Sequence, residues 1–88
     1  MRIVAPSNAF DRDIRRLEKR GKDLSKLYAV IHRLAKGEPL AAKHKPHPLK
    51  GRWHPRWDCH IEPDWILIYE ATKDELRLSR TGSHSDFF

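Results

Sequence analysis

Five of the six histidines in the chain lie between positions 44 and 84, and their side chains could move protons. The unperturbed pKa of histidine, about 6.5, is close to physiological pH, so a histidine can serve as general base or general acid. RNA carries its own nucleophile, the 2′-hydroxyl. Its cleavage needs a base for that hydroxyl, an acid for the leaving 5′-oxygen and cations for the phosphate. A single histidine is usually an ordinary surface residue, but this group favours acid–base chemistry.

A metal centre is the alternative use of these side chains. His44 and His47 lie three residues apart, and Cys59 is adjacent to His60. Adjacent residues of a strand point to opposite faces, so Cys59 and His60 cannot both bind one ion. The chain contains neither Cys-x-x-Cys nor His-Glu-x-x-His. We therefore expect no metal site and no other cofactor.

The charge balance narrows the class of partner. Eighteen lysines and arginines against twelve acidic residues give a net charge of +6 in 88 residues. Such a field attracts polyanions, nucleic acid first and an acidic protein segment second, although it could also serve solubility alone. One cysteine excludes an internal disulfide. The first residues do not form a signal peptide, and no apolar run approaches the ~20 residues of a membrane span. We expect a cytoplasmic protein without membrane association.

The first half of the chain predicts two helices. Apolar residues at helical spacing occupy one face of residues 10–17, and Gly21 ends this helix. A second apolar stripe covers residues 24–34, with Asp23 as its N-cap and Gly37 after its end. The turn between them is short, so the helices should form an antiparallel hairpin.

The second half predicts strands. Residues 57–62 alternate between apolar and polar types, residues 65–69 are continuously apolar, and residues 76–79 alternate again. Tight turns join these segments as hairpins, which gives an antiparallel sheet. Residues 2–5 form a weakly marked edge strand. The expected fold is α/β (α+β), with a two-helix hairpin packed on one face of a small antiparallel sheet, as a single domain over residues 1–88.

Strand alternation assigns side chains to the two faces of this sheet. The set directed towards the helices contains Trp57, Cys59, Ile61, Leu76 and Leu78. The set on the opposite, open face contains Asp58, His60, Glu62, Arg77 and Ser79. His84 follows Gly82, whose flexibility should let the histidine fold back over the sheet. His47 lies in a basic loop before the first hairpin strand, so we expect His47, His60 and His84 to converge.

Three further side chains are expected to hold the substrate. Lys50 lies in the basic loop, and Arg77 lies on the open face. Phe88 follows His84 by four residues and could either stack on a base or simply pack against the protein.

Three segments of the chain resemble the YafQ family of the RelE superfamily. They are His-Pro-Leu-Lys-Gly at 47–51, Cys-His-Ile-Glu-Pro-Asp-Trp-Ile-Leu-Ile-Tyr at 59–69 and Arg-Thr-Gly-Ser-His-Ser-Asp-Phe-Phe at 80–88. The resemblance implies a RelE-like fold and a type II toxin that cleaves mRNA in the ribosomal A site. The matching site positions of the family are His47, His60, Asp64, His84 and Phe88. Residues 52–55 are bulkier than the family pattern, which puts the adjacent strand edge in doubt.

The resemblance also suggests roles and partners. His47 is expected as general base, His84 as general acid, His60 as a phosphate-stabilising group and Asp64 as the group that orients a histidine or the substrate, although these roles could be exchanged. The reaction would be metal-independent endoribonucleolysis. The partners implied are a cognate antitoxin, mRNA and the ribosomal RNA of the 70S A site, with operator DNA bound through the antitoxin. The alternative is a non-catalytic RelE-like binding module that engages a partner protein, RNA or the ribosome.

Overall fold

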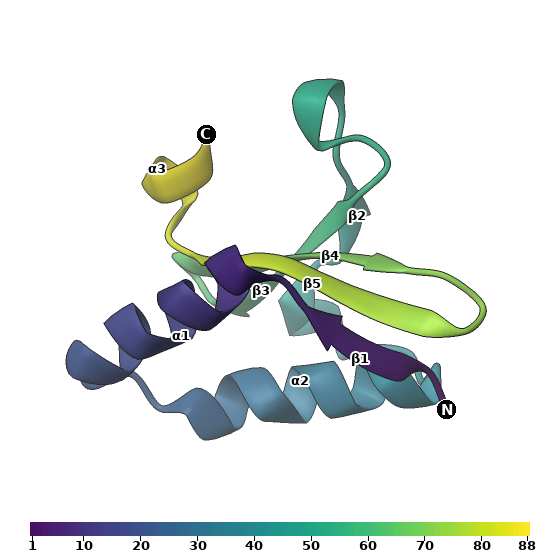
Figure 1. Cartoon of the computed structure of the whole chain (residues 1–88), viewed down its shortest axis with the longest axis horizontal. Helices are drawn as coiled ribbons and strands as arrows, with labels where there is room; N and C mark the ends of the chain where they lie inside the picture. The colour runs from purple at the N-terminus through teal and green to yellow at the C-terminus, as the bar shows by residue number, and fades with distance from the viewer.

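A five-stranded sheet in the order β1-β5-β4-β3-β2 forms the centre of the computed structural model, which describes all residues from Met1 to Phe88. The strands are β1 (Ile3–Pro6), β2 (His47–Pro48), β3 (Trp57–Glu62), β4 (Trp65–Ala71) and β5 (Glu75–Gly82). The helices are α1 (Asn8–Lys19), α2 (Leu24–Lys36) and α3 (His84–Phe87), with 3-10 turns η1 (Ala42–His44) and η2 (Gly51–Trp53). In Figure 1, α1 and α2 form an antiparallel pair on one face of the sheet, whereas α3 and the segment around β2 stand over the other.

Local capping explains where the two long helices begin and end. The hydroxyl of Ser7 accepts a hydrogen bond from the Phe10 amide at 2.9 Å, and the carboxylate of Asp23 accepts one from the Ser25 amide at 3.1 Å. Gly37 adopts a left-handed conformation with φ of 73° and ends α2. Both predicted helices are therefore confirmed. No helix combines the length and the apolar character that a membrane crossing requires.

The hairpins β3–β4 and β4–β5 are antiparallel, as predicted, but the sheet is mixed. Strand β1 pairs with β5 in parallel, with Val4 opposite Leu76. The antiparallel prediction for the consecutive strands is confirmed, but the hairpin rule gives no pairing for β1, because two helices and three strands separate β1 from β5 in the sequence.

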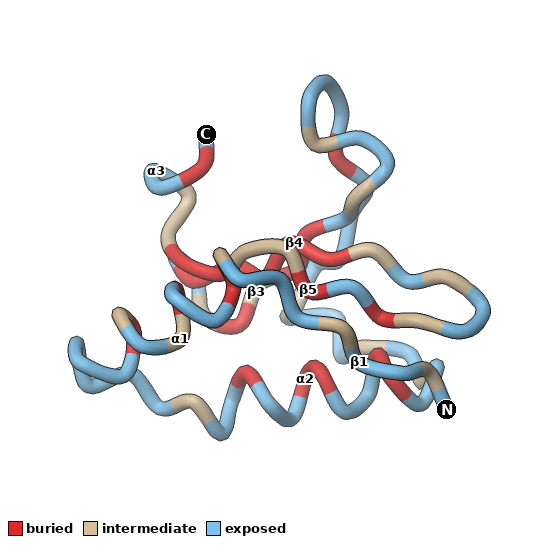
Figure 2. The backbone as a smooth tube through the Cα atoms, in the orientation of Figure 1, coloured by how far each residue is buried: buried red, intermediate tan, exposed pale blue.

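The main hydrophobic core lies between the helix pair and the sheet, where Figure 2 shows buried positions on the inner sides of both helices. Trp65 is 1% exposed and belongs to this core, as predicted. Trp57 is 41% exposed, so the expectation that it packs towards the helices as a core residue was wrong. It begins β3 beside Gly37, where α2 has already ended and no longer covers it.

The opposite face of the sheet is less open than alternation suggested. A second apolar cluster of Leu49, Ile66, Ile68 and Phe87, with Trp53 packed against it, covers part of this face. These residues come from the β2–β3 connection, β4 and α3. They frame the region that the histidines occupy.

Two β-bulges change the predicted alternation. A register shift between His60 and Glu62 turns Glu62 towards α2, where Lys22 and Lys26 bind its carboxylate at 3.0 and 2.9 Å. The assignment of Glu62 to the open face was therefore wrong, because a bulge inserts one residue and reverses the parity beyond it. A second shift leaves Ser79 without a cross-strand partner, with Leu78 opposite Tyr69 and Arg80 opposite Ile68.

Candidate active site

His47 and Asp58 face each other across the β2–β3 pair. The distance between His47 Nδ1 and Asp58 Oδ1 is 2.9 Å. The side chain of Asp58 is 1% exposed, whereas that of His47 is 52% exposed. Apart from this contact, the buried Oδ1 has no hydrogen-bond partner in the protein. A nearly buried carboxylate thus holds a histidine whose outer edge remains open to a ligand.

The electrostatics place three histidines around this one carboxylate. Burial raises the pKa of Asp58 above its ordinary value, and the opposing influences that lower it come from His47, His60 and His84. Burial has the larger effect. The three histidines that were expected to converge therefore all influence one carboxylate, that of Asp58, which His47 contacts directly.

His60, His84 and Phe88 form a row of rings. The ring centroids of His60 and His84 are 5.3 Å apart, and those of His84 and Phe88 are 5.8 Å apart. His60 Nδ1 lies 3.2 Å from the carbonyl oxygen of Pro63. A carbonyl can only accept a hydrogen bond, so the proton of neutral His60 belongs on Nδ1 and its Nε2 is free to act on a substrate.

Asp64 fixes the start of α3. Its Oδ1 accepts a hydrogen bond from the backbone amide of His84 at 3.3 Å and lies 3.9 Å from His84 Nδ1. The side chain of Asp64 is itself 77% exposed. Asp64 therefore contacts His84 from the rim of the site.

The C-terminal helix is anchored at two points beyond His84. The Asp86 carboxylate accepts a hydrogen bond from the Ser83 amide at 2.9 Å, which also lowers the pKa of Asp86, and the Phe87 ring is buried in the second apolar cluster. A Cβ atom on Gly82 would lie 2.6 Å from Asp86 Oδ2 and 3.2 Å from the Phe87 ring. Gly82 is therefore needed here because it has no side chain, which lets α3 pack closely against it. It is not a flexible link, because it is the last residue of β5.

Two of the three predicted substrate-binding residues lie beside the site. Lys50 is exposed and immediately precedes η2, and Phe88 is 57% exposed next to His84. Arg77 lies elsewhere. Its guanidinium binds Glu75 at 2.9 Å and Glu70 at 3.2 Å, towards the far end of the β4–β5 hairpin.

Arg77 and His60 leave the same face of the sheet, as expected, but they lie far apart along it. His60 pairs with Ile66 of β4, whereas Arg77 pairs with Glu70, four residues further along that strand. At about 3.3 Å per residue this separates them by roughly 13 Å. Alternation assigns a face, but it does not give the position along a strand.

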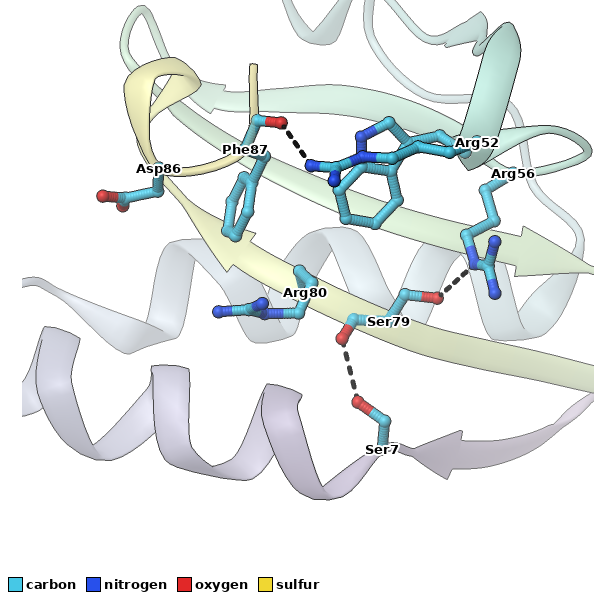
Figure 3. Close-up of a pocket in the computed structure, with 8 residues that line it drawn as sticks. Ser7, Arg52, Arg56, Ser79, Arg80, Asp86 and Phe87 are labelled. Atoms are coloured by element: carbon cyan, nitrogen blue, oxygen red, sulfur yellow. Dashed lines mark hydrogen bonds between the residues drawn. The ribbon is translucent and has the colours of Figure 1, made fainter.

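The sequence interpretation missed the role of Asp58 and the position of Arg80 beside Arg52 and Arg56, two arginines that it had placed in a basic cluster near the site. Asp58 was assigned only to the open face, and its burial against His47 depends on the register of β2, a strand of two residues. Arg52, Arg56 and Arg80 line a pocket beside α3, which Figure 3 shows together with Ser79 and Phe87. The only signal for this group was the basic composition of the connection before β3.

No group of three His, Cys, Asp or Glu side chains is arranged to hold one ion. Cys59 is buried on the helix side of the sheet, and burial raises the pKa of its thiol to about 12. The thiol is therefore neither a metal ligand nor a nucleophile for the histidine cluster.

Comparison with known proteins gives consistent matches over the full chain. A family model described as the bacterial toxin YafQ of type II toxin–antitoxin systems matches residues 2–88. The mRNA interferase toxin YafQ of Escherichia coli K12 is 42% identical over 88 residues, which cover 99% of this chain and 96% of that protein.

Two solved structures show the same fold. The toxin in the E. coli DinJ–YafQ toxin–antitoxin complex superposes with a TM-score of 0.91 at 42% identity, covering 99% of this chain and 97% of that one. A metal-bound toxin from Helicobacter pylori superposes with a TM-score of 0.94 at 44% identity, covering both chains completely.

Proposed function

The chain belongs to the YafQ family of toxins from bacterial type II toxin–antitoxin systems, and on this premise we propose that it cleaves messenger RNA on the ribosome without a metal ion. The observation that carries the proposal is the contact of His47 with the buried Asp58, beside the ring pair of His60 and His84. These groups supply the base and the acid that attack by a 2′-hydroxyl requires.

His47 acts as the general base. Its Nδ1 faces two acceptors, Asp58 Oδ1 at 2.9 Å and the Lys45 carbonyl oxygen at 3.3 Å, so the neutral ring carries its proton on Nδ1. Nε2 is then free to take the proton of the 2′-hydroxyl. The carboxylate of Asp58 stabilises the imidazolium that forms.

His84 acts as the general acid. The 2′-oxygen attacks phosphorus, the bond from phosphorus to the 5′-oxygen breaks, and His84 protonates that oxygen. The products are a 5′-hydroxyl end and a 2′,3′-cyclic phosphate end, which becomes a 3′-phosphate if a water molecule then attacks the phosphorus and the bond to the 2′-oxygen breaks. His60 stabilises the charge on the phosphate from its position 5.3 Å from the His84 ring. Asp64 is a positioning residue, because it holds the amide of His84.

The substrate is held by groups at the edge of the cluster. Lys50 is exposed and has no ion pair in the protein, so its ammonium group is available to a phosphate. Phe88 presents an exposed ring next to His84, where a base can stack. Both residues remain in the proposed substrate site, whereas Arg77 does not.

The proposed protein partners follow from the family and the charge. The E. coli relative forms a complex with its antitoxin DinJ. We infer that this chain has a cognate antitoxin that covers its basic surface, and that the pair binds operator DNA through the antitoxin. The same basic surface, with a net charge of +6, suits ribosomal RNA in the A site.

The direct test is to induce the protein in cells and map new 5′ ends on messenger RNA. Cleavage on ribosomes should give ends in phase with the reading frame and with 5′-hydroxyl chemistry. A protein that binds ribosomes but generates no new ends would instead be a non-catalytic member of the fold.

Metal independence needs its own test, since a relative from H. pylori has been crystallised with metal bound. The purified protein is treated with EDTA and then assayed with magnesium, which keeps the ribosomes intact, and with a chelator selective for transition metals. Cleavage should continue under these conditions. Loss of cleavage that one transition metal ion restores would contradict the acid–base mechanism.

A further inference from the structure

A pocket of about 510 Å³ lies on the sheet face between η2, α3 and the end of β5. Its lining includes Arg52, Trp53, Arg56, Ser79, Arg80 and Phe87, most of which Figure 3 labels. None of these residues has a part in the acid–base cluster. The acid–base mechanism therefore assigns no role to this pocket.

Two of its three arginines have no acidic partner. Arg56 Nε donates to the Ser79 hydroxyl at 3.1 Å, and an Arg52 terminal nitrogen donates to the Phe87 carbonyl oxygen at 3.3 Å. Neither guanidinium lies within 4.0 Å of a carboxylate. A guanidinium offers five N–H donors, so most of the donors of Arg52 and Arg56 remain available.

The third arginine, Arg80, has a structural role, because it binds a buried carboxylate. Arg80 donates to both oxygens of the buried Asp13, at 2.8 and 3.0 Å, a carboxylate that it shares with Arg16. Asp86 also lines the pocket, but Figure 3 shows its carboxylate directed away from Arg52 and Arg56, and it accepts the Ser83 amide. Arg52 and Arg56 therefore present uncompensated positive charge.

The pocket continues the row of rings that begins at the histidines. The Phe88 ring lies 5.8 Å from His84 on one side and 6.1 Å from Trp53 on the other. The Arg52 guanidinium lies 5.3 Å from the Trp53 ring. An exposed aromatic ring thus stands between the acid–base cluster and the arginine pair.

We propose that Arg52 and Arg56 bind a second phosphate of the RNA backbone, next to the scissile phosphate on the side of Phe88. This inference rests on the proposed function, because it extends the same substrate track. Guanidinium groups bind phosphate with two parallel hydrogen bonds, and a base stacked on Phe88 would connect the two phosphates. An acidic protein segment would use the same charges but not the exposed ring between the two sites.

The first experiment measures RNA binding without cleavage. The probe is a fluorescent hexanucleotide with 2′-O-methyl sugars, titrated by anisotropy at several salt concentrations. The variant Arg52→Gln with Arg56→Gln should bind about 10-fold more weakly. Its plot of log K against log salt should lose about 0.7 in slope, the value for one phosphate contact on a single strand. A dinucleoside monophosphate probe, with a single phosphate, should not distinguish the variant from the wild type.

Two further variants serve as controls. Lys73→Gln with Arg33→Gln removes two exposed charges outside the pocket and should leave the salt slope nearly unchanged. Arg52→Lys with Arg56→Lys keeps the charge but loses the paired hydrogen bonds, so it should keep the slope and bind with intermediate affinity. This variant also keeps the inference testable if the Gln variant folds poorly.

The outcomes separate this inference from the proposed function. If the Gln variant binds the hexanucleotide as tightly as the Lys73→Gln with Arg33→Gln control, the pocket is not a phosphate site, whether or not the wild type cleaves message. If that variant keeps RNA affinity but loses affinity for a glutamate-rich peptide, the pocket is a docking site for an acidic protein segment and the inference is overturned. A wild type that binds RNA through the pocket but cuts no message would contradict only the proposed activity.

Discussion

Asp58 contacts His47 at 2.9 Å from a position that is almost wholly shielded from water, while His47 itself is half exposed. Burial dominates the electrostatics of this pair, because the pKa of Asp58 lies above its ordinary value despite three neighbouring histidines. The protein therefore keeps a carboxyl group where its charged form is unfavourable. We interpret this cost in stability as the consequence of orienting the general base.

Replacing Asp58 with asparagine should lower activity and raise stability at neutral pH. A carboxyl whose pKa is raised on folding favours the folded state below its unfolded value of 3.8, and this contribution is lost as the pH rises through the folded value. The asparagine side chain carries no charge, so the gain from D58N should be largest near pH 7 and shrink towards pH 4. Urea unfolding at several pH values measures this, and cleavage should fall about 10-fold or more because asparagine carries no negative charge to stabilise the His47 imidazolium. The pKa argument would be contradicted if the stability of D58N minus that of the wild type were smaller at pH 7 than at pH 4.

His84→Gln should remove cleavage while the fold persists. General acid–base groups contribute about 10²–10⁴-fold in rate, and the His84 side chain is 44% exposed at the start of α3, outside the main core. The measurement is the single-turnover cleavage rate beside the urea midpoint. The matched control is His32→Gln, an exposed histidine of α2, which should change neither quantity. Full activity in H84Q would remove His84 from the mechanism.

Gly82→Ala should impair cleavage by displacing α3. The added methyl group would meet Asp86 Oδ2 at 2.6 Å and the Phe87 ring at 3.2 Å. The Asp86 carboxylate would then have to leave the Ser83 amide and the Phe87 ring would have to move, which removes both anchors of α3 and with them the position of His84. The rate should fall about 10-fold or more, since small displacements of catalytic groups are costly. Gly21→Ala provides the contrast: its left-handed φ of 79° makes alanine unfavourable by about 1 kcal/mol, but open space surrounds it and activity should be normal.

Asp13→Asn should destabilise the protein by about 2–3 kcal/mol. The Asp13 carboxylate is 1% exposed and accepts hydrogen bonds from Arg80, Arg16 and the Thr81 amide. The expected loss is smaller than that for wholly buried pairs because both arginines are partly exposed and remain solvated. Urea unfolding gives the value, and Asp11→Asn on the exposed side of α1 should cost much less.

Free RNA should be a poorer substrate than ribosome-bound message. The histidine cluster is half exposed and cannot by itself enforce the in-line geometry of cleavage. Arg15→Glu with Lys19→Glu reverses two exposed charges of α1 and should weaken ribosome binding while sparing any slow cleavage of naked RNA. Paired assays on ribosomes and on the same message alone measure both effects, with Arg15→Lys as control. Equal rates on both substrates would make this a free-standing ribonuclease.

Local patterns in the sequence were sufficient for the helices and for most of the sheet. The caps at Asp23 and Gly37 act within a few residues, and so do the alternation and turns of β3 to β5. The two β-bulges escaped prediction because each depends on how one strand fits its neighbour. Glu62 changed face for that reason.

The composition of the site was easier to predict than its geometry. His47, His60, Asp64 and His84 could be named from residue types and family resemblance, and the structure groups the three histidines around Asp58. The position of Arg77 along its strand and the burial of Asp58 are tertiary properties. They depend on pairings between β2, β3 and β5 that no short segment contains.

Strand β1 has a consequence for the order in which the protein folds. Arg2, beside this strand, donates to the Thr72 carbonyl oxygen, 70 positions away in the chain. The antiparallel strands that carry His60 and end at the His84 helix are neighbours in sequence. Closing a long loop costs more entropy than closing a short one, and long-range pairs tend to form late. The three-stranded meander can therefore form first, and the N-terminal edge can dock onto a sheet that already carries Asp58 and His60 in register.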